Sequence, residues 1–202
     1  AFTTHDQMIE AIRIPEEVLN SLTTVELVEL CLNYPLSFDF FAYNSLQEGL
    51  RQNVAVNFNG VQELFRRSDN AKCLLDALKR NGLLELQSKE NVLTTLQIGR
   101  LINRYSIAEV LTSHEAVLTN ADAGQLREIA AVAVKNTLLK ERGTHLYGSL
   151  SLESSAYLLG AALKTADVVA APSPELERFI KNGTTSDVRL LIEELVNNYF
   201  KF

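Results

Sequence analysis

Histidine is the residue type best suited to proton transfer or metal binding, and this chain has three, His5, His114 and His145. No two of them stand three or four positions apart, the spacing that places two ligands on one face of a helix. The sequence also contains no glycine-rich phosphate-binding motif. It therefore predicts no metal site and no bound cofactor.

A polar link at residues 144–149 contains His145 and Tyr147, and Ser149 and Ser151 follow closely. A serine near a histidine is the pair that nucleophilic catalysis uses. However, the G-x-S-x-G turn that mounts such a serine is missing, and both serines are typical N-caps for the helix that follows. We therefore predict no catalytic residue.

Arg100 and Arg104 stand one helical turn apart, beside Asn103 and Tyr105. Two guanidinium groups at this spacing can grip a carboxylate or a phosphate from one face of a helix. The alternative is that they belong to a solvated helix surface. If the chain binds a ligand through residues visible in the sequence, the predicted binding residues are Arg100, Arg104, Tyr105, His145 and Tyr147.

Two apolar helices, residues 125–142 and 152–169, form the part of the chain that is poorest in charge. Their apolar side chains recur at three- and four-residue steps and therefore share faces. Gly160 lies inside the second helix, where glycine costs up to about 1 kcal/mol relative to alanine. We expect these helices to be central, with the others wrapped around them and Gly160 packed against Ala130 and Ala133 of the first helix.

Helix starts and stops recur through the rest of the chain, for example Ser173 before Pro174 at a start and Gly183 at an end. Strand signals are confined to residues 54–56 and to the aromatic run near Phe40. The predicted class is all-α, with irregular helical hairpins packed as an α-α superhelix or an orthogonal bundle. We expect roughly nine or ten helices in a single domain spanning residues 1–202.

Cys31 and Cys73 are the only cysteines, and each lies among apolar neighbours at helical spacing. Two cysteines are too few for a disulfide framework. We predict that both are buried free thiols, with a disulfide between them as the alternative.

The chain has 202 residues, of which 47% are hydrophobic and 22% charged, so it is long enough to bury a substantial core. Its net charge of −6 argues against a nucleic-acid partner, which would require clustered Lys and Arg. No run of apolar residues approaches the roughly 18 that a transmembrane helix needs.

Residues 22–64 contain a set of short motifs: Cys31-Leu32-Asn33-Tyr34-Pro35, Asn44-Ser45, Gly49, Phe58-Asn59-Gly60 and Glu63-Leu64. This pattern resembles uncharacterised all-helical proteins exported by gut Bacteroidetes. The resemblance covers the first third of the chain most closely and transfers no catalytic residue. It implies a secreted, periplasmic or cell-surface setting and a leader peptide ahead of Ala1. In physical terms, Asn59 is typical of an N-cap.

The sequence supports two hypotheses about function, from different classes of protein. The first is a non-catalytic helical binding or structural module of a secreted or cell-surface protein, whose partner is a protein, a peptide or a surface glycan. The alternative is an enzyme, in the cytoplasm or exported, whose site is assembled from scattered polar residues near His145 and the pair Arg100 and Arg104. A deep pocket on which two or more of His145, Tyr147, Arg100 and Arg104 converge would favour the enzyme.

Overall fold

The computed structural model describes residues 4–80, 94–143 and 148–202. Within these ranges every regular element is helical and no strand occurs, which confirms the all-α class. The described helices number 13, when the continuous run from Leu46 to Asn57 is counted once. This exceeds the nine or ten expected, because several helices last only one or two turns.

The N-terminal half begins with two short helices and continues through a series of compact turns. Its elements are α1 (His5–Ala11), α2 (Glu16–Ser21), α3 (Thr24–Leu32), α4 (Phe38–Phe41), α5 (Leu46–Gly49), a π-helical turn η1 (Leu50–Val54), α6 (Ala55–Asn57), α7 (Asn59–Arg66) and α8 (Asn70–Arg80). The weak strand signal at residues 54–56 therefore lies in helix, and the aromatic run forms the helical turn α4.

Longer helices make up the C-terminal half. They are α10 (Thr95–Thr112), α11 (Glu115–Leu118), α12 (Ala123–Arg142), α14 (Ser149–Thr165), α15 (Pro174–Asn182) and α16 (Arg189–Tyr199). Ser173 caps α15, and Gly183 ends it in a left-handed conformation with φ of 77°, as their positions predict. Helix α10 runs through Tyr105 without a break.

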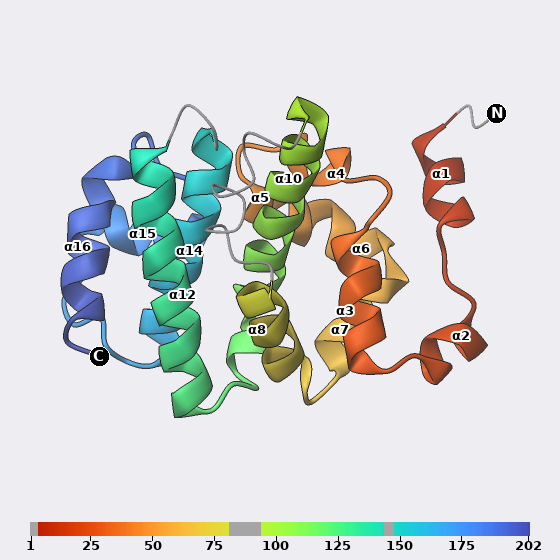
Figure 1. Ribbon diagram of the computed structural model, residues 1–202, viewed down its shortest axis with the longest axis horizontal. Helices are drawn as coiled ribbons and strands as arrows, with labels where there is room; N and C mark the ends of the chain where they lie inside the picture. The colour runs from red at the N-terminus through yellow and green to blue at the C-terminus, as the bar shows by residue number, and fades with distance from the viewer. Residues whose placement is uncertain (1–3, 81–93, 144–147) are drawn as a thin grey trace.

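Helices α12 and α14 pack side by side, as predicted for the two apolar helices (Figure 1). Helices α15 and α16 pack against this pair on one side, and α8 and α10 on the other. The N-terminal helices α3 and α7 pack against α8 instead. The pair is therefore the centre of the C-terminal half, and the expectation that all other helices wrap around it holds only for that half.

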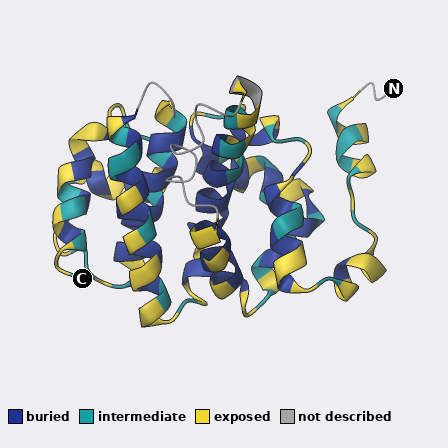
Figure 2. Ribbon diagram, viewed as in Figure 1, coloured by how far each residue is buried: buried dark blue, intermediate teal, exposed yellow. Residues whose placement is uncertain are grey.

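The core is one continuous cluster of buried apolar side chains that runs through both halves (Figure 2). Cys31 and Cys73 are both part of it and both are free, which confirms the prediction of buried thiols. Burial raises the pKa of the Cys31 thiol, so the group is an inert apolar filler.

Gly160 is buried in α14, as predicted, but its close neighbours are different ones. A Cβ atom at this position would lie 3.0 Å from Cγ1 of Ile180 on α15 and 3.3 Å from Cδ2 of Leu195 on α16. The predicted neighbours Ala130 and Ala133 of α12 are not among these atoms. Side chains of two other helices fill the space beside Gly160. The glycine therefore allows α15 and α16 to pack closely against α14.

Asn59 ties the N-terminal arm to the rest of the fold. Its side-chain oxygen accepts from the Ile14 N–H at 3.1 Å, and its Nδ2 donates to the Ile14 carbonyl at 2.7 Å. The N-cap of α7 is Phe58, so the reading of Asn59 as an N-cap is wrong. A second tie joins His5 of α1 to the buried Asp39 of α4, with 2.8 Å between Nε2 and Oδ1.

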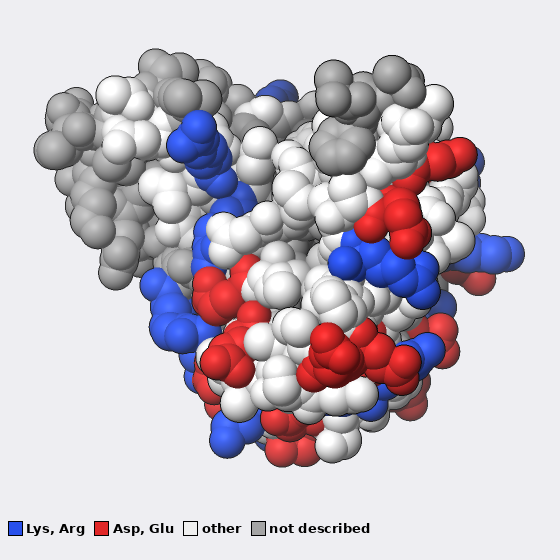
Figure 3. All heavy atoms as spheres, turned by 90° about the vertical axis from the view of Figure 1, so that its right-hand side faces the viewer, with Lys and Arg blue, Asp and Glu red and all other residues white. Residues whose placement is uncertain are grey.

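Acidic and basic side chains stand next to one another over the face that the N-terminal helices present (Figure 3). Glu63, for example, is paired with both Arg66 and Arg67 on α7. Among the described residues, no helix combines the length and the apolar character needed to cross a membrane.

Candidate binding pocket

The structure brings Arg100 and Arg104 together on one face of α10, as their spacing predicts. With Asn103 they line an open hollow of about 360 Å³ between α10 and the end of α3. The Arg104 guanidinium, however, pairs with Glu29 of α3, and Arg80 of α8 approaches the same carboxylate at 3.8 Å. Arg104 therefore joins helices, and Arg100 is left exposed on the rim of the hollow.

Tyr105 does not line this hollow. It is buried in a small apolar cluster with Ile102, against which the partly buried Leu139 packs. His145 and Tyr147 lie outside the described residues. The described part of the chain thus unites two of the five predicted binding residues and engages one of those two in an ion pair.

A buried ion pair between α10 and α12 went unnoticed in the sequence. Glu109 and Lys140 are both 0% exposed, and the Lys140 Nζ donates to the Glu109 Oε2 at 2.7 Å. The same ammonium donates to the Ser151 carbonyl at 2.9 Å. Burial lowers the pKa of Lys140, while the facing carboxylate acts in the opposite direction.

Three neutral side chains complete the shell around the Glu109 carboxylate. Asn136 donates to it at 2.9 Å, Ser154 at 2.8 Å and Ser155 at 2.6 Å. A buried charge pair is tolerated when hydrogen bonds satisfy its remaining lone pairs and protons, as they do here. Because its members are buried and bonded to one another, this network holds α10, α12 and α14 together and offers no open position to a ligand.

Ser151 belongs to the same buried region, where its hydroxyl lies 3.0 Å from that of Ser106. The N-cap of α14 is Gly148, with φ of 71° and no side-chain cap bond, so the reading of Ser149 and Ser151 as N-caps is wrong. A sequence signal for the network did exist. Glu109 is a lone acid within an apolar run, and such a residue is buried only when it has partners.

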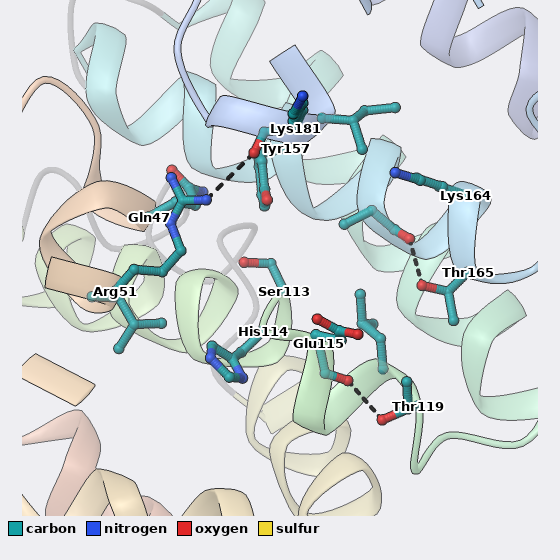
Figure 4. A pocket seen from close by; sticks show the side chains of 14 residues that line it. Gln47, Arg51, Ser113, His114, Glu115, Thr119, Tyr157, Lys164, Thr165 and Lys181 are labelled. Carbon is teal, nitrogen blue, oxygen red and sulfur yellow. Dashed lines mark hydrogen bonds between the residues drawn. The ribbon is translucent and has the colours of Figure 1, made fainter. Parts of the chain in front are cut away.

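A second cavity, which we call the α14–α15 pocket, has a volume of about 560 Å³ (Figure 4). It lies where α5, η1, α11, α14 and α15 meet, together with the residues that join α10 to α11. Its lining residues are Gln47, Leu50, Arg51, Ser113, His114, Glu115, Leu118, Thr119, Tyr157, Ala161, Lys164, Thr165, Ile180 and Lys181.

Cations outnumber anions around this pocket. Arg51, Lys164 and Lys181 line it together with a single carboxylate, that of Glu115, which gives a formal charge of +2. The whole chain carries −6, so the pocket is a positive site on an acidic protein. Such a site attracts anions and repels cations.

Arg51 crosses from η1 to the end of α15. Its Nη2 donates to the Asn182 carbonyl at 2.9 Å and its Nη1 lies 3.4 Å from the Lys181 carbonyl, the latter bond being drawn in Figure 4. These carbonyls belong to the last turn of α15, the negative end of the helix dipole, where a cation is stabilised. Arg51 is nevertheless exposed, so its charge also reaches the solvent side of the pocket.

Gln47 is the unusual member of the lining. The residue is 3% exposed, yet neither Oε1 nor Nε2 has a hydrogen-bond partner among the described residues. An unpaired buried amide is destabilising by roughly 1–3 kcal/mol, and more than nine in ten buried polar groups avoid it. Among the buried side chains of the described residues, Gln47 alone has polar atoms without a partner.

Tyr157 and Lys164 come from the same face of α14, at a spacing of seven residues with Ala161 between them. Burial raises the pKa of the Tyr157 hydroxyl, and the nearby Arg51 charge opposes this, so the phenol is protonated and can donate. The Tyr157 ring is fixed by an edge-to-face contact with Phe179, at 5.7 Å between centroids. Neither its hydroxyl nor the Lys164 ammonium bonds to another described residue, and both extend into the pocket (Figure 4).

His114 supports the wall of the pocket. Its Nδ1 accepts from the Ala116 N–H at 3.2 Å, which caps α11, and its ring stacks on Phe65 at 3.9 Å. Burial lowers the pKa of His114 below its ordinary value; the Glu115 charge opposes this and the nearby Arg51 adds a smaller lowering, so the ring is neutral at pH 7. Because Nδ1 already accepts the Ala116 N–H, this nitrogen is not free to act as a base.

The serine and threonine hydroxyls that line the pocket are committed to the backbone. Ser113 donates to the Val110 carbonyl, Thr119 to the Glu115 carbonyl and Thr165 to the Ala161 carbonyl, at 2.8, 2.8 and 2.9 Å. A nucleophile needs a base within hydrogen-bond reach, and none of these hydroxyls has one. The described residues also contain no cluster of three metal-ligating side chains. What the lining offers chemically is positive charge and hydrogen-bonding groups.

Sequence reasoning missed this pocket because its residues come from segments more than 100 positions apart. One signal was available, since Lys164 is one of very few charges in an otherwise apolar helix. Comparison with protein-family models, with curated proteins and with solved structures gave no match to this chain. The function of this chain is therefore inferred from the geometry of the pocket.

Proposed function

We propose that this chain is a non-catalytic helical binding module whose ligand occupies the α14–α15 pocket. The observation that carries the proposal is the buried, unpaired amide of Gln47 in the lining of that pocket. A volume of about 560 Å³ suits a small molecule, since ligand pockets commonly measure about 300–1,000 Å³. Apolar side chains line part of the cavity and a few polar groups line the rest, which is the usual composition of such sites.

Among the partners expected from the sequence, a protein or peptide would insert one or two residues into a pocket of this volume, and a glycan one sugar unit. The secreted, periplasmic or cell-surface setting rests on the resemblance of residues 22–64 and stays a prediction. Fractionation of cells that express the natural full-length gene would test it, because an export signal would move the protein out of the cytoplasm.

The proposal is tested by mapping where small molecules bind. We expect a library of fragments with mixed charge to shift amide resonances of residues around the α14–α15 pocket in two-dimensional NMR spectra of the ¹⁵N-labelled protein. Ala161→Leu should abolish these shifts, because the added side chain extends from α14 into the cavity. Ala131→Leu is the matched control, since Ala131 is exposed on α12 and far from the lining.

Urea unfolding of both variants establishes that each is folded before the spectra are compared. Fragment shifts that stay unchanged in Ala161→Leu, or that gather elsewhere on the surface, would contradict the proposed function.

A further inference from the structure

The chemical nature of the ligand follows from the groups that the α14–α15 pocket leaves without partners. We propose that the pocket binds the carboxylate and the adjacent amide N–H of an N-acylated amino acid or of a free peptide C-terminus. This inference rests on the proposed function and adds the class of ligand to it. Each part of the ligand corresponds to one group of the lining.

The carboxylate is assigned to the positive side of the pocket. Lys164 and the Tyr157 hydroxyl are donors without a partner among the described residues, and Arg51 lies close enough to Tyr157 to influence its pKa. Hydrogen bonds from charged donors to a carboxylate are about twice as strong as neutral ones. The formal charge of +2 around the pocket repels cationic ligands.

The amide N–H is assigned to Gln47. An ionised carboxylate only accepts hydrogen bonds, so it could satisfy Nε2 of this side chain but never Oε1. Satisfying Oε1 requires a donor on the ligand, and an acylated amino acid carries its N–H two bonds from the carboxylate carbon. The ligand thus needs both groups, at the short separation that this chemistry provides.

Gln47 and Tyr157 stand close enough to serve one small ligand. Both adjoin the same point beside Gly183, since a Cβ at that glycine would lie 3.2 Å from Gln47 Cβ and 3.7 Å from Tyr157 Cε2. Gln47 and Arg51 are one turn apart in the continuous helical run and therefore share a face. Gln47, Arg51 and Tyr157 therefore lie at one end of the pocket, and Lys164 reaches into it from two turns further along α14.

An apolar side chain of the ligand has a matching surface. Leu50, Leu118, Ala161 and Ile180 contribute hydrocarbon to the lining, and leucine-sized groups are the natural occupants of such a surface. Affinity should come from burying this side chain, and selectivity from the carboxylate and the amide.

Isothermal titration calorimetry with four probes tests the inference. N-acetyl-L-leucine carries all three features, N-acetyl-L-leucinamide lacks the charge, 4-methylpentanoate lacks the amide, and inorganic phosphate is an anion alone. We expect N-acetyl-L-leucine to bind at least about tenfold more tightly than each of the others, because a charged or buried hydrogen bond contributes about 1.5–3 kcal/mol. The tripeptide alanyl-alanyl-leucine and its C-terminal amide then distinguish a peptide terminus from a free acylated amino acid.

Variants assign the contacts. Lys164→Gln should weaken N-acetyl-L-leucine about tenfold and leave the binding of its amide unchanged, while Gln47→Met should remove the preference over 4-methylpentanoate. Lys135→Gln, an exposed lysine on α12, is the matched control and should have no effect.

The outcomes separate the two proposals. If neutral fragments bind in the pocket but N-acetyl-L-leucine binds no more tightly than its amide, the ligand class is wrong and the binding module stands. Preference for phosphate over the carboxylate probes would also overturn the ligand class. If no probe or fragment reaches the pocket, both proposals fail.

Discussion

Glu109 and Gln47 are both buried polar residues, but the structure surrounds them in opposite ways. The Glu109 carboxylate accepts hydrogen bonds from four side chains on α12 and α14. The Gln47 amide, at the edge of a cavity, has none among the described residues. A fully bonded charge fixes how helices pack, whereas a buried amide without a partner has hydrogen bonds still to make. This difference is the reason we propose the binding site at Gln47 and not at Glu109.

The largest effect is expected where the bonded network is broken. Lys140→Met removes the cation and leaves the Glu109 carboxylate buried without its counter-charge, which should lower the free energy of unfolding by about 3–5 kcal/mol. Urea unfolding followed by circular dichroism measures this. Lys135→Met, on the exposed face of the same helix, should change the value by less than about 0.5 kcal/mol.

The double variant Glu109→Leu/Lys140→Met sharpens this test, because it removes both charges. It should recover part of the loss, since apolar replacements for a whole buried ion pair are often tolerated. A Lys140→Met protein that unfolds at the parent urea concentration would show that the pair is not buried as described.

Gly160 offers the next largest effect, and it tests packing without charge. Gly160→Leu should lower the free energy of unfolding by about 1–3 kcal/mol, because the new side chain meets Ile180 and Leu195 at the distances given above. Gly99→Leu is the matched control, since a Cβ at Gly99 in α10 would meet no atom of the described residues within 4 Å, its own helix backbone aside. The control should be neutral or stabilising by up to about 1 kcal/mol through helix propensity. Equal losses in both variants would contradict the assigned packing.

The sequence predicted the helical class because periodic apolar residues and caps are local signals. The burial of Gly160 was predicted from its intrinsic cost in a helix, but its neighbours Ile180 and Leu195 were not, because tertiary packing selects among many apolar faces. The sites show the same limit. Glu109 was visible in the sequence as a lone acid in an apolar helix, but its partners Lys140, Ser154 and Ser155 come from other helices that no spacing rule connects.

A smaller effect of opposite sign is expected at Gln47. Gln47→Met keeps the length of the side chain and removes both unpaired polar atoms, so it should raise the free energy of unfolding by about 1 kcal/mol. Urea unfolding without any ligand measures this, and Gln52→Met on the exposed face of η1 should change little. A loss of stability in Gln47→Met would show that the amide already has a partner, which would remove the main support for the binding site.

The smallest effect concerns Glu153, a half-buried acid on α14 that neighbours the network residues Ser154 and Ser155 but has no bonded partner among the described residues. It lines a separate hollow with Asp187 and Arg189, and burial raises its pKa from 4.5 to about 7. The folded state therefore holds this proton more tightly than the unfolded state. Stability contributed by the protonated group is present in full below about pH 4.5 and is lost as the pH rises to about 7.

Because the carboxyl is partly exposed, solvent screening reduces this loss to about 1 kcal/mol or less. Glu153→Gln should remove it, so that the variant matches the parent at pH 4.5 and is more stable at pH 7.5, as measured by urea unfolding at both values. If the parent and the variant show the same pH dependence, the Glu153 carboxylate is already stabilised in the fold. In that case, the contrast between bonded and unbonded polar groups would not extend to α14 outside the network.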